Sequence, residues 1–224
     1  MALFQIQNLR SKEVHRKISV NVILPIDSHR EHHSGEKFRT LYLLHGTTDN
    51  NMAWLLNTRL YELAERYNLC VVLPNGENSF YMNREDRFEN WGNFFAQELP
   101  MLLRRAFPLS ERREDTFIGG FSMGGYGALR NGLKYHDTFG KICCFAPALE
   151  LEYTMDCTYD AEDYLRNRGF VEAHYGKGLE DAVESDKNPL WLIDQLSAQG
   201  VELPKIFLAT GEDDGLLPVQ QSIV

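Results

Sequence analysis

A serine set between glycines is the residue in this sequence that is best placed to do chemistry. Ser122 is the centre of a G-x-S-x-G, Gly120 to Gly124, which follows the apolar run Thr116–Ile118 and precedes a helical run from Tyr126 to Tyr135. A nucleophile at a tight strand-to-helix turn needs small neighbours, because the backbone is strained there and the helix leaves close to the sheet. We therefore predict that Ser122 is a catalytic nucleophile and that the amide of Met123 faces an oxyanion. The alternative is a helix N-cap serine, which needs no such glycines.

A second polar segment, His45-Gly46-Thr47, follows the apolar run Leu41–Leu44. In a doubly wound sheet, loops at the carboxyl ends of the strands border the site, and a second oxyanion donor is expected just past this strand. Gly46 lets the chain turn toward the site, so we assign the backbone NH of Thr47 as that donor. His45 could be a catalytic base, but we expect it to brace the loop by hydrogen bonding instead.

A third segment, Gly211-Glu212-Asp213-Asp214-Gly215, follows the apolar run Ile206–Ala209. The acid of a catalytic triad in such a fold comes after the serine in the chain, at the carboxyl end of a later strand, where it orients a histidine. Three carboxylates compete for this role. The G-x-x-D spacing favours Asp214, with Asp213 second, and the alternative is an acidic surface turn.

Taken together, these segments resemble a known family. LYLLHG, ELP, FIGGFSMGGYGALR and GEDD are similar to the α/β-hydrolase esterases related to tributyrin esterase and S-formylglutathione hydrolase (esterase D), over roughly residues 18–218. The resemblance implies that Ser122 attacks an ester or thioester carbonyl, that Met123 contributes to the oxyanion hole and that Asp214 is the triad acid. It implies a serine carboxylesterase or thioesterase that hydrolyses small acyl esters through an acyl-enzyme, without a cofactor.

The histidine base of this family follows the acid in chain order. After Asp214 the sequence has ten residues and no histidine, and all seven histidines come earlier: His15, His29, His32, His33, His45, His136 and His174. Similar family members continue with a helix, a last strand, a loop that carries the histidine and a terminal helix, about 35 to 45 residues. We therefore expect a natural gene product that is longer at the C-terminus, so that the last strand and helix are missing here. The alternative is a degenerate hydrolase.

Two of the histidines present, His136 and His174, are candidate substitutes for the missing base. His136 ends the helix that follows Ser122, which places it too far away along the helix axis. His174 lies in an acidic segment that could fold over the site, so a role for it stays open.

Three aromatic residues near the predicted edge of the site could line a substrate pocket: Trp54, Tyr81 and Trp91. Aromatic walls suit short acyl chains or cinnamoyl-type aromatics, and ordinary core packing is the alternative for each residue. Two other functions stay open. One is an acyltransferase in which a sugar or alcohol replaces water, and the other is a non-catalytic pseudo-esterase binding module.

The elements that must position these residues alternate between strand-type and helix-type runs, which predicts an α/β-hydrolase fold with a mostly parallel central sheet. Alternating apolar and polar residues predict an N-terminal antiparallel hairpin from Phe4–Leu9 and Ile18–Leu24, before a polar loop over 27–37. Buried strands are predicted at 41–44, 69–73, 116–118, 142–145 and 206–209. Helices are predicted at 53–67, at 93–107 with a bend or late start at Pro100, and at 126–135.

The segment Glu150–Lys187 interrupts this rhythm and holds 11 acidic and 4 basic residues. We interpret it as an acidic, cap-like excursion from a single domain that spans residues 1–224, although a solvated helical surface is the simpler alternative. Short helices are predicted at Asp160–Arg168 and at Trp191–Ser197.

The composition limits the partners of the protein. Lys and Arg number 23 and Asp and Glu number 32, so the net charge of −9 argues against nucleic acid and anionic membranes. The four cysteines lack C-x-x-C spacing, and the first ten residues do not read as a signal peptide, so we expect reduced thiols in a cytoplasmic protein. His29, His32 and His33 are more typical of a solvated loop than of a metal site. A sheet edge left open by a missing last strand would favour homo-oligomers.

Overall fold

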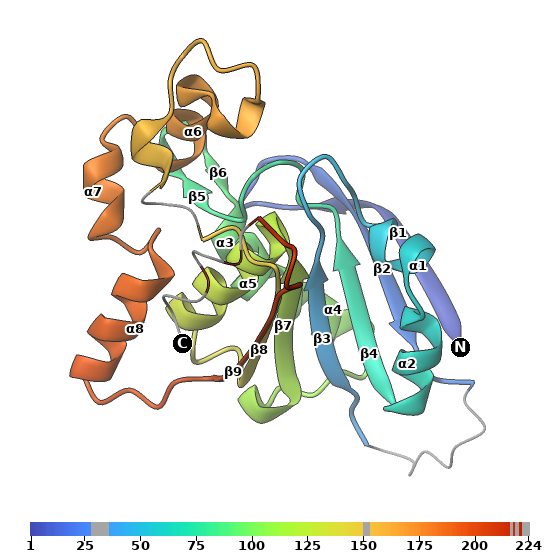
Figure 1. Ribbon diagram of the computed structural model, residues 1–224. Coiled ribbons are helices and arrows are strands. Elements are labelled where there is room, and N and C mark those ends of the chain that lie inside the picture. The colour runs from blue at the N-terminus through green and yellow to red at the C-terminus, as the bar shows by residue number, and fades with distance from the viewer. Residues whose placement is uncertain (28–35, 150–152, 216, 218–219, 221–224) are drawn as a thin grey trace.

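The computed structural model of the chain describes residues 1–27, 36–149, 153–215, 217 and 220. The strands of its central sheet are β1 (Ala2–Arg10), β2 (Lys17–Leu24), β3 (Arg39–Leu44), β4 (Leu69–Pro74), β7 (Thr116–Phe121), β8 (Lys141–Phe145) and β9 (Lys205–Ala209). They lie side by side in the order β1-β2-β4-β3-β7-β8-β9 (Figure 1). β2 pairs antiparallel with both of its neighbours, β1 and β4. All the other neighbouring strands of this sheet pair in parallel. The predicted hairpin and the mostly parallel sheet are confirmed.

Helices cover both faces of this sheet. On one face, α1 (Ala53–Asn57) and α2 (Leu60–Arg66) cover a small apolar cluster in which Leu60 packs with Leu43 and Val71. On the other face, the neighbouring strand residues Leu44 and Val72 belong to the larger core, together with residues of α4 (Leu99–Ala106) and α5 (Met123–Lys134). Successive side chains of a strand point to opposite faces, so each central strand is buried on both sides.

Two predicted helices are interrupted. The helix predicted at 53–67 divides into α1 and α2 because Thr58 has an extended backbone (φ −140°, ψ 170°). The helix predicted at 93–107 begins as α3 (Trp91–Asn93), passes through a π-helical segment η2 (Phe94–Glu98) and continues as α4. Pro100 is the second residue of α4 and follows the π-helical segment η2 directly, inside one continuous helical run over residues 91–106. The late start predicted from Pro100 is therefore wrong: the helical run already begins at Trp91, and the irregularity beside Pro100 is the π-helical segment.

The excursion after β8 is helical and lies to one side of the sheet, near α5 (Figure 1). It contains η4 (Tyr153–Asp156), η5 (Tyr164–Arg166), α6 (Arg168–Tyr175) and α7 (Leu179–Val183), and α8 (Pro189–Ala198) follows it. The helix predicted at 160–168 is wrong, because Asn167 caps a helix that begins only at Arg168: its side chain accepts hydrogen bonds from the amides of Gly169 and Phe170. The helix predicted at 191–197 corresponds to α8.

Short elements absent from the sequence prediction connect the main ones. A two-stranded hairpin, β5 (Asn83–Arg84) and β6 (Glu89–Asn90), encloses the 3₁₀ turn η1 (Glu85–Arg87), and η3 (Arg113–Asp115) precedes β7. All four cysteines are in the described part of the chain and are free thiols. Among the described residues, no helix combines the length and apolar character needed to cross a membrane.

Candidate active site

Ser122 occupies a strained turn between β7 and α5. Its backbone has φ 54° and ψ −118°, a conformation that non-glycine residues adopt only when surrounding contacts hold it, at a cost of roughly 1–3 kcal/mol. The Ser122 amide donates to the carbonyl of Phe145 at 3.0 Å, and its carbonyl accepts from the amides of Tyr126 and Ala148 at 3.0 and 3.2 Å. The backbone of the serine is thus fixed by β8, the residues just after it and α5, and Ser122 lines a cavity.

The start of α5 packs directly on the end of β3. A Cβ atom at Gly124 would lie 2.5 Å from the carbonyl oxygen of Leu44 and 2.6 Å from that of His45. Contacts this short do not occur between carbon and oxygen, so only glycine lets the helix approach the strand here. The glycine of the predicted motif therefore joins the nucleophile turn to the second predicted segment.

Hydrogen bonds hold the loop after β3 along most of its length. The indole of Trp54 donates to the Leu44 carbonyl at 3.0 Å, and the Thr48 amide donates to the side-chain oxygen of Asn78 at 2.8 Å. Within the described ranges, the amide of Thr47 between these anchors has no hydrogen-bond partner. A backbone donor is thereby presented in a loop that is fixed on both sides.

His45 is one of the groups that fix this loop. Its Nε2 accepts a hydrogen bond from the amide of Gly76 at 2.9 Å, so Nδ1 carries the proton and donates to the carbonyl of Gly46 at 2.7 Å. Burial lowers the pKa of His45 and favours this neutral form. The prediction that His45 braces the loop is confirmed, and both of its ring nitrogens are engaged away from Ser122.

One cavity of about 80 Å³ brings the predicted groups together. Thr47, Ser122 and Met123 all line it, from the end of β3 and the start of α5. The other lining residues are Phe80, Ala148, Leu165, Phe170, Val171, His174 and Tyr175. The cavity thus has a polar side built from backbone turns and an otherwise mostly apolar lining.

The three aromatic residues predicted to line the pocket are not among the residues that line this cavity. Trp91 is 1% exposed and stacks on Phe95, with ring centroids 5.7 Å apart, and Tyr81 is fully buried beneath the loop after β3. Trp54 packs on Phe145 and holds Leu44, outside the cavity. The three side chains serve packing and positioning, which the sequence could not distinguish from substrate contact because the same residue types serve all three.

The apolar wall comes instead from two places that sequence reasoning missed. Phe80 precedes the buried Tyr81, and α6 contributes Phe170, Val171 and Tyr175. The available signal was the cap residue Asn167 followed by these apolar side chains, which marks an amphipathic helix within an otherwise acidic segment.

His174 of α6 lines the same cavity as Ser122. Its Nδ1 lies 2.8 Å from the carbonyl oxygen of Phe170 and its Nε2 lies 2.5 Å from that of Asn78. Burial, helped by the charges of Arg84 and Arg87, lowers the pKa of His174, although the two carbonyl contacts act to raise it. Both ring nitrogens therefore face carbonyl oxygens rather than the serine.

The two remaining described histidines do not line the cavity. His136 lies beyond the C-terminal end of α5, and its Nδ1 is 3.2 Å from the carbonyl oxygen of Leu133. The ring of His15 packs edge-on against Phe88. His29, His32 and His33 fall outside the described residues, as does most of the predicted loop 27–37.

Asp214 lies in the loop after β9, at the same edge of the sheet as the nucleophile turn. β9 pairs with β8 and β8 with β7, in a register that aligns Phe121, Phe145 and Ala209. Two strand spacings separate β9 from β7, so this loop begins roughly 10 Å from the turn that carries Ser122. The amide of Asp214 donates to the carbonyl of Gly211 at 3.1 Å, which closes the turn.

A metal centre has no donor set in the described ranges, since no three His, Cys, Asp or Glu side chains gather closely enough there to hold an ion.

The chain matches proteins of known class along almost all its length. Residues 11–221 match the sequence model of the esterase family described as "Putative esterase". An acetyl esterase of Caldicellulosiruptor saccharolyticus is 39% identical over 221 residues, which is 97% of this chain and 82% of that protein.

Solved structures agree with this match. The fluorophosphonate-binding serine hydrolase F of Staphylococcus aureus is 27% identical with a TM-score of 0.84, covering 99% of this chain and 84% of that one. The S-formylglutathione hydrolase of the same organism is 25% identical with a TM-score of 0.81, over 100% of this chain and 85% of that one. The nucleophile turn, the strand order and these matches together show that the chain belongs to the esterase family and is a serine hydrolase with the α/β-hydrolase fold.

Proposed function

We propose that this protein is a carboxylesterase or thioesterase that hydrolyses esters of short acyl groups through an acyl-enzyme on Ser122. The observation that carries the proposal is the strained Ser122 at the wall of a cavity that Thr47 and Met123 also line. A nucleophile and two backbone amides around one small cavity are the parts that acyl transfer requires.

In the proposed reaction, the Ser122 oxygen attacks the acyl carbonyl and loses its proton to a general base. The amides of Thr47 and Met123 stabilise the oxyanion of the tetrahedral intermediate. Collapse of this intermediate breaks the ester bond, and the base returns the proton to the leaving alcohol or thiol. Water then attacks the acyl-enzyme by the same route and releases the acid.

The base in this scheme is a histidine oriented by Asp214. Among the described residues, neither His45 nor His174 turns a ring nitrogen toward Ser122, since both nitrogens of each ring contact backbone groups. The proposal therefore requires a histidine outside the described residues, and the chain order serine, acid, histidine places it after Asp214. Reading the gene past the codon of Val224 tests this requirement: a stop codon directly after it would support the non-catalytic alternative.

The size of the cavity supports a short acyl group over a cinnamoyl group. A buried apolar cavity of about 150 Å³ holds one benzene molecule, and the cavity beside Ser122 is about 80 Å³. The acetyl and formyl groups in the names of two similar proteins are small enough for such a space.

The test uses the polypeptide encoded by the whole reading frame and p-nitrophenyl esters of acetate, butyrate and hexanoate. Ser122→Ala is expected to lower kcat by more than about 10⁴-fold, as for other serine hydrolases. Ser197→Ala, on α8, is the matched control and should leave turnover unchanged. A fluorophosphonate should modify the peptide that contains Ser122. Wild-type turnover by Ser122→Ala would contradict the proposal, and acyl transfer to an added alcohol in place of acid release would redirect it to the acyltransferase.

A further inference from the structure

The segment between β4 and β5 contains two consecutive residues in a strained conformation. Phe80 and Tyr81 have φ values of 52° and 57°, and neither is a glycine. The two adjacent side chains have different surroundings: Phe80 lines the cavity, whereas Tyr81 is fully buried. Strain of this kind persists only where neighbouring contacts hold it, and it points to a role for the residue concerned.

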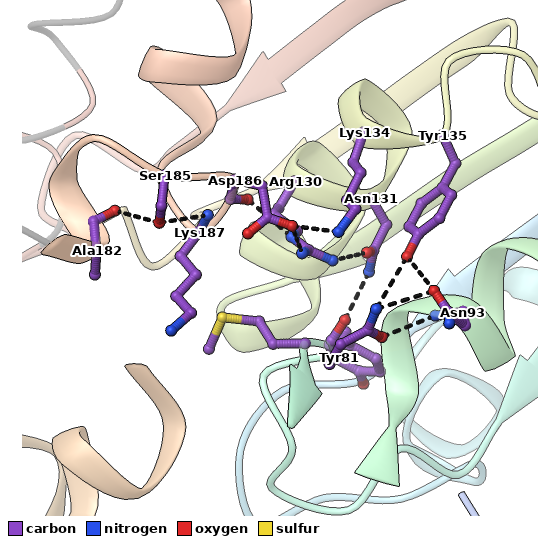
Figure 2. Close-up of polar contacts among 12 residues, drawn as sticks. Tyr81, Asn93, Arg130, Asn131, Lys134, Tyr135, Ala182, Ser185, Asp186 and Lys187 are labelled. Atoms are coloured by element: carbon purple, nitrogen blue, oxygen red, sulfur yellow. Dashed lines mark hydrogen bonds and ion pairs between the residues drawn. The ribbon is translucent and has the colours of Figure 1, made fainter. Parts of the chain in front are cut away.

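The contacts of Tyr81 leave it one orientation. The side-chain amide of Asn131 donates to the Tyr81 carbonyl at 2.9 Å, and Arg130 and Asp186 extend this network (Figure 2). The ring packs edge-on against Phe95, with centroids 4.9 Å apart. It also lies directly against Gly127 of α5, where any added Cβ would overlap the ring.

The hydroxyl of Tyr81 donates to the carbonyl of His45 at 2.8 Å. Burial raises the pKa of Tyr81 well above its usual value, so the hydroxyl stays a donor throughout the working pH range. The same carbonyl oxygen of His45 is one of the two that a Cβ at Gly124 would meet, at 2.6 Å. Tyr81 therefore fixes the peptide unit that lies between the nucleophile helix and the loop that carries Thr47.

We infer that Tyr81 is a positioning residue that aims the Thr47 amide at the oxyanion, by fixing the carbonyl of His45 two residues earlier. This inference rests on the proposed function, because it assigns the oxyanion role to Thr47. A shift of the loop moves the Thr47 donor without altering the walls that bind the acyl group, so the effect falls on kcat rather than on KM.

The test is Tyr81→Phe, which removes the hydroxyl and keeps the ring. We expect kcat for p-nitrophenyl acetate to fall about tenfold, less than the loss of a whole oxyanion donor, with KM within about twofold of wild type. Hydrogen–deuterium exchange of the Thr48 amide, which donates to Asn78, should become faster. Tyr135→Phe is the matched control: it loses a 2.7 Å hydrogen bond to Asn93 near the other end of α5 and should keep both kcat and the exchange pattern.

The outcomes are distinguishable. Wild-type kcat in Tyr81→Phe, or equal effects in Tyr81→Phe and Tyr135→Phe, would overturn the inference. Full activity of Ser122→Ala would overturn the proposed function instead, while the exchange at the loop would still report whether Tyr81 holds it. If Tyr81→Phe does not fold, Asn131→Ser weakens the support of Tyr81 while keeping its hydroxyl. That variant should show the same changes at smaller size, and unchanged kcat and exchange in it would overturn the inference.

Discussion

The two sides of the cavity are built by different means. The sheet wall, formed by Thr47, Ser122 and Met123, consists of backbone turns at the ends of β3 and β7. The helix wall, formed by Phe170, Val171 and Tyr175 of α6, consists of packed side chains. A backbone turn has one geometry that its hydrogen bonds permit, whereas a side-chain surface changes with each substitution. We therefore expect the sheet wall to carry the chemistry and the helix wall to set the size of the acyl group.

Asn78 connects the two walls. Its side-chain oxygen accepts from the Thr48 amide at 2.8 Å, next to the oxyanion donor, and its carbonyl oxygen lies 2.5 Å from Nε2 of His174. The helix wall is also tied to the nucleophile helix through the segment that follows α7, where the hydroxyl of Tyr126 donates to the carbonyl of Lys187 at 2.6 Å. These few polar contacts make the two walls one site.

The largest difference between the walls should appear when glycine is replaced by alanine in each. Gly124→Ala forces a Cβ to within 2.6 Å of two carbonyl oxygens of the sheet wall, so we expect kcat/KM to fall by more than about 100-fold and stability by about 3 kcal/mol. Gly169→Ala, in the first turn of α6, meets the Asn167 side-chain oxygen at 3.2 Å and the Tyr159 ring at 4.0 Å, and should be close to neutral. Ester hydrolysis and urea unfolding measure both. Similar losses in the two variants would show that the walls do not differ in tolerance.

A smaller effect is expected on acyl-chain selectivity. Val171→Ala enlarges the cavity from the helix wall, so the ratio of kcat/KM for butyrate over acetate should rise about tenfold, the size expected for one or two methylenes. The kcat for acetate should change little. Val183→Ala, on α7 and away from the cavity lining, is the control. A fall in kcat for every ester, with no change in the ratio, would assign α6 a role in the chemistry itself.

The anchoring of the helix wall should be visible in stability. Asp186 pairs with Arg130, whose side chain is 2% exposed, and with Lys134 (Figure 2). Burial by itself raises the pKa of Asp186, but the two cations outweigh it and lower the pKa overall. Asp186→Asn leaves the Arg130 guanidinium without its counter-charge, so we expect a loss of about 2 kcal/mol, between the values for exposed and buried pairs.

The pH dependence checks this assignment. Because the folded-state pKa of Asp186 is depressed, its contribution is present above the unfolded-state value, near 3.9, and is lost as the pH falls through the folded-state value. Urea unfolding at pH 3 and pH 7 should show the Asp186→Asn difference shrinking at the lower pH. Glu184→Gln, on an exposed residue nearby, should show no such difference. A loss in Asp186→Asn that does not depend on pH would be a packing effect.

The smallest effect concerns the two buried histidines, one beside each wall. The pKa values of His45 and His174 are both lowered by burial, so the unfolded chain takes up protons first, near pH 6.5. Stability from each histidine is therefore complete above that pH and is lost as the pH falls below it, by at most about 1.4 kcal/mol per pH unit. Either His→Gln change should flatten the curve of unfolding free energy between pH 5 and 7.

Activity separates the two histidines. His45→Gln should also lower kcat, because His45 holds the carbonyl of Gly46 in the sheet wall. His174→Gln should act mainly on KM or on acyl-chain selectivity. A large loss of kcat in His174→Gln, with kcat retained in His45→Gln, would reverse these roles and would restore His174 as a candidate base.

The sequence by itself determined the sheet, the nucleophile turn and the bracing role of His45. These follow from local signals: apolar runs that must be buried on both faces, and glycines where a helix leaves a strand closely. The register of β7, β8 and β9 then placed Ser122 and the loop of Asp214 at one edge, as their order along the chain predicts. The interrupted helices, the start of α6 and the roles of the aromatic residues were not predicted correctly.

Only the tertiary structure decided which side chains face the cavity. Tyr81 and Phe80 are adjacent in sequence and have different surroundings, because of a backbone strain that Asn131, fifty positions away, helps to hold. The helix wall belongs to a segment whose acidic composition suggested a solvated surface. The position of this segment depends on contacts between residues more than fifty positions apart, such as Arg130 with Asp186. Local propensity carries no information about such pairings, so the chemistry could be predicted from the motif while the size of the acyl group could not.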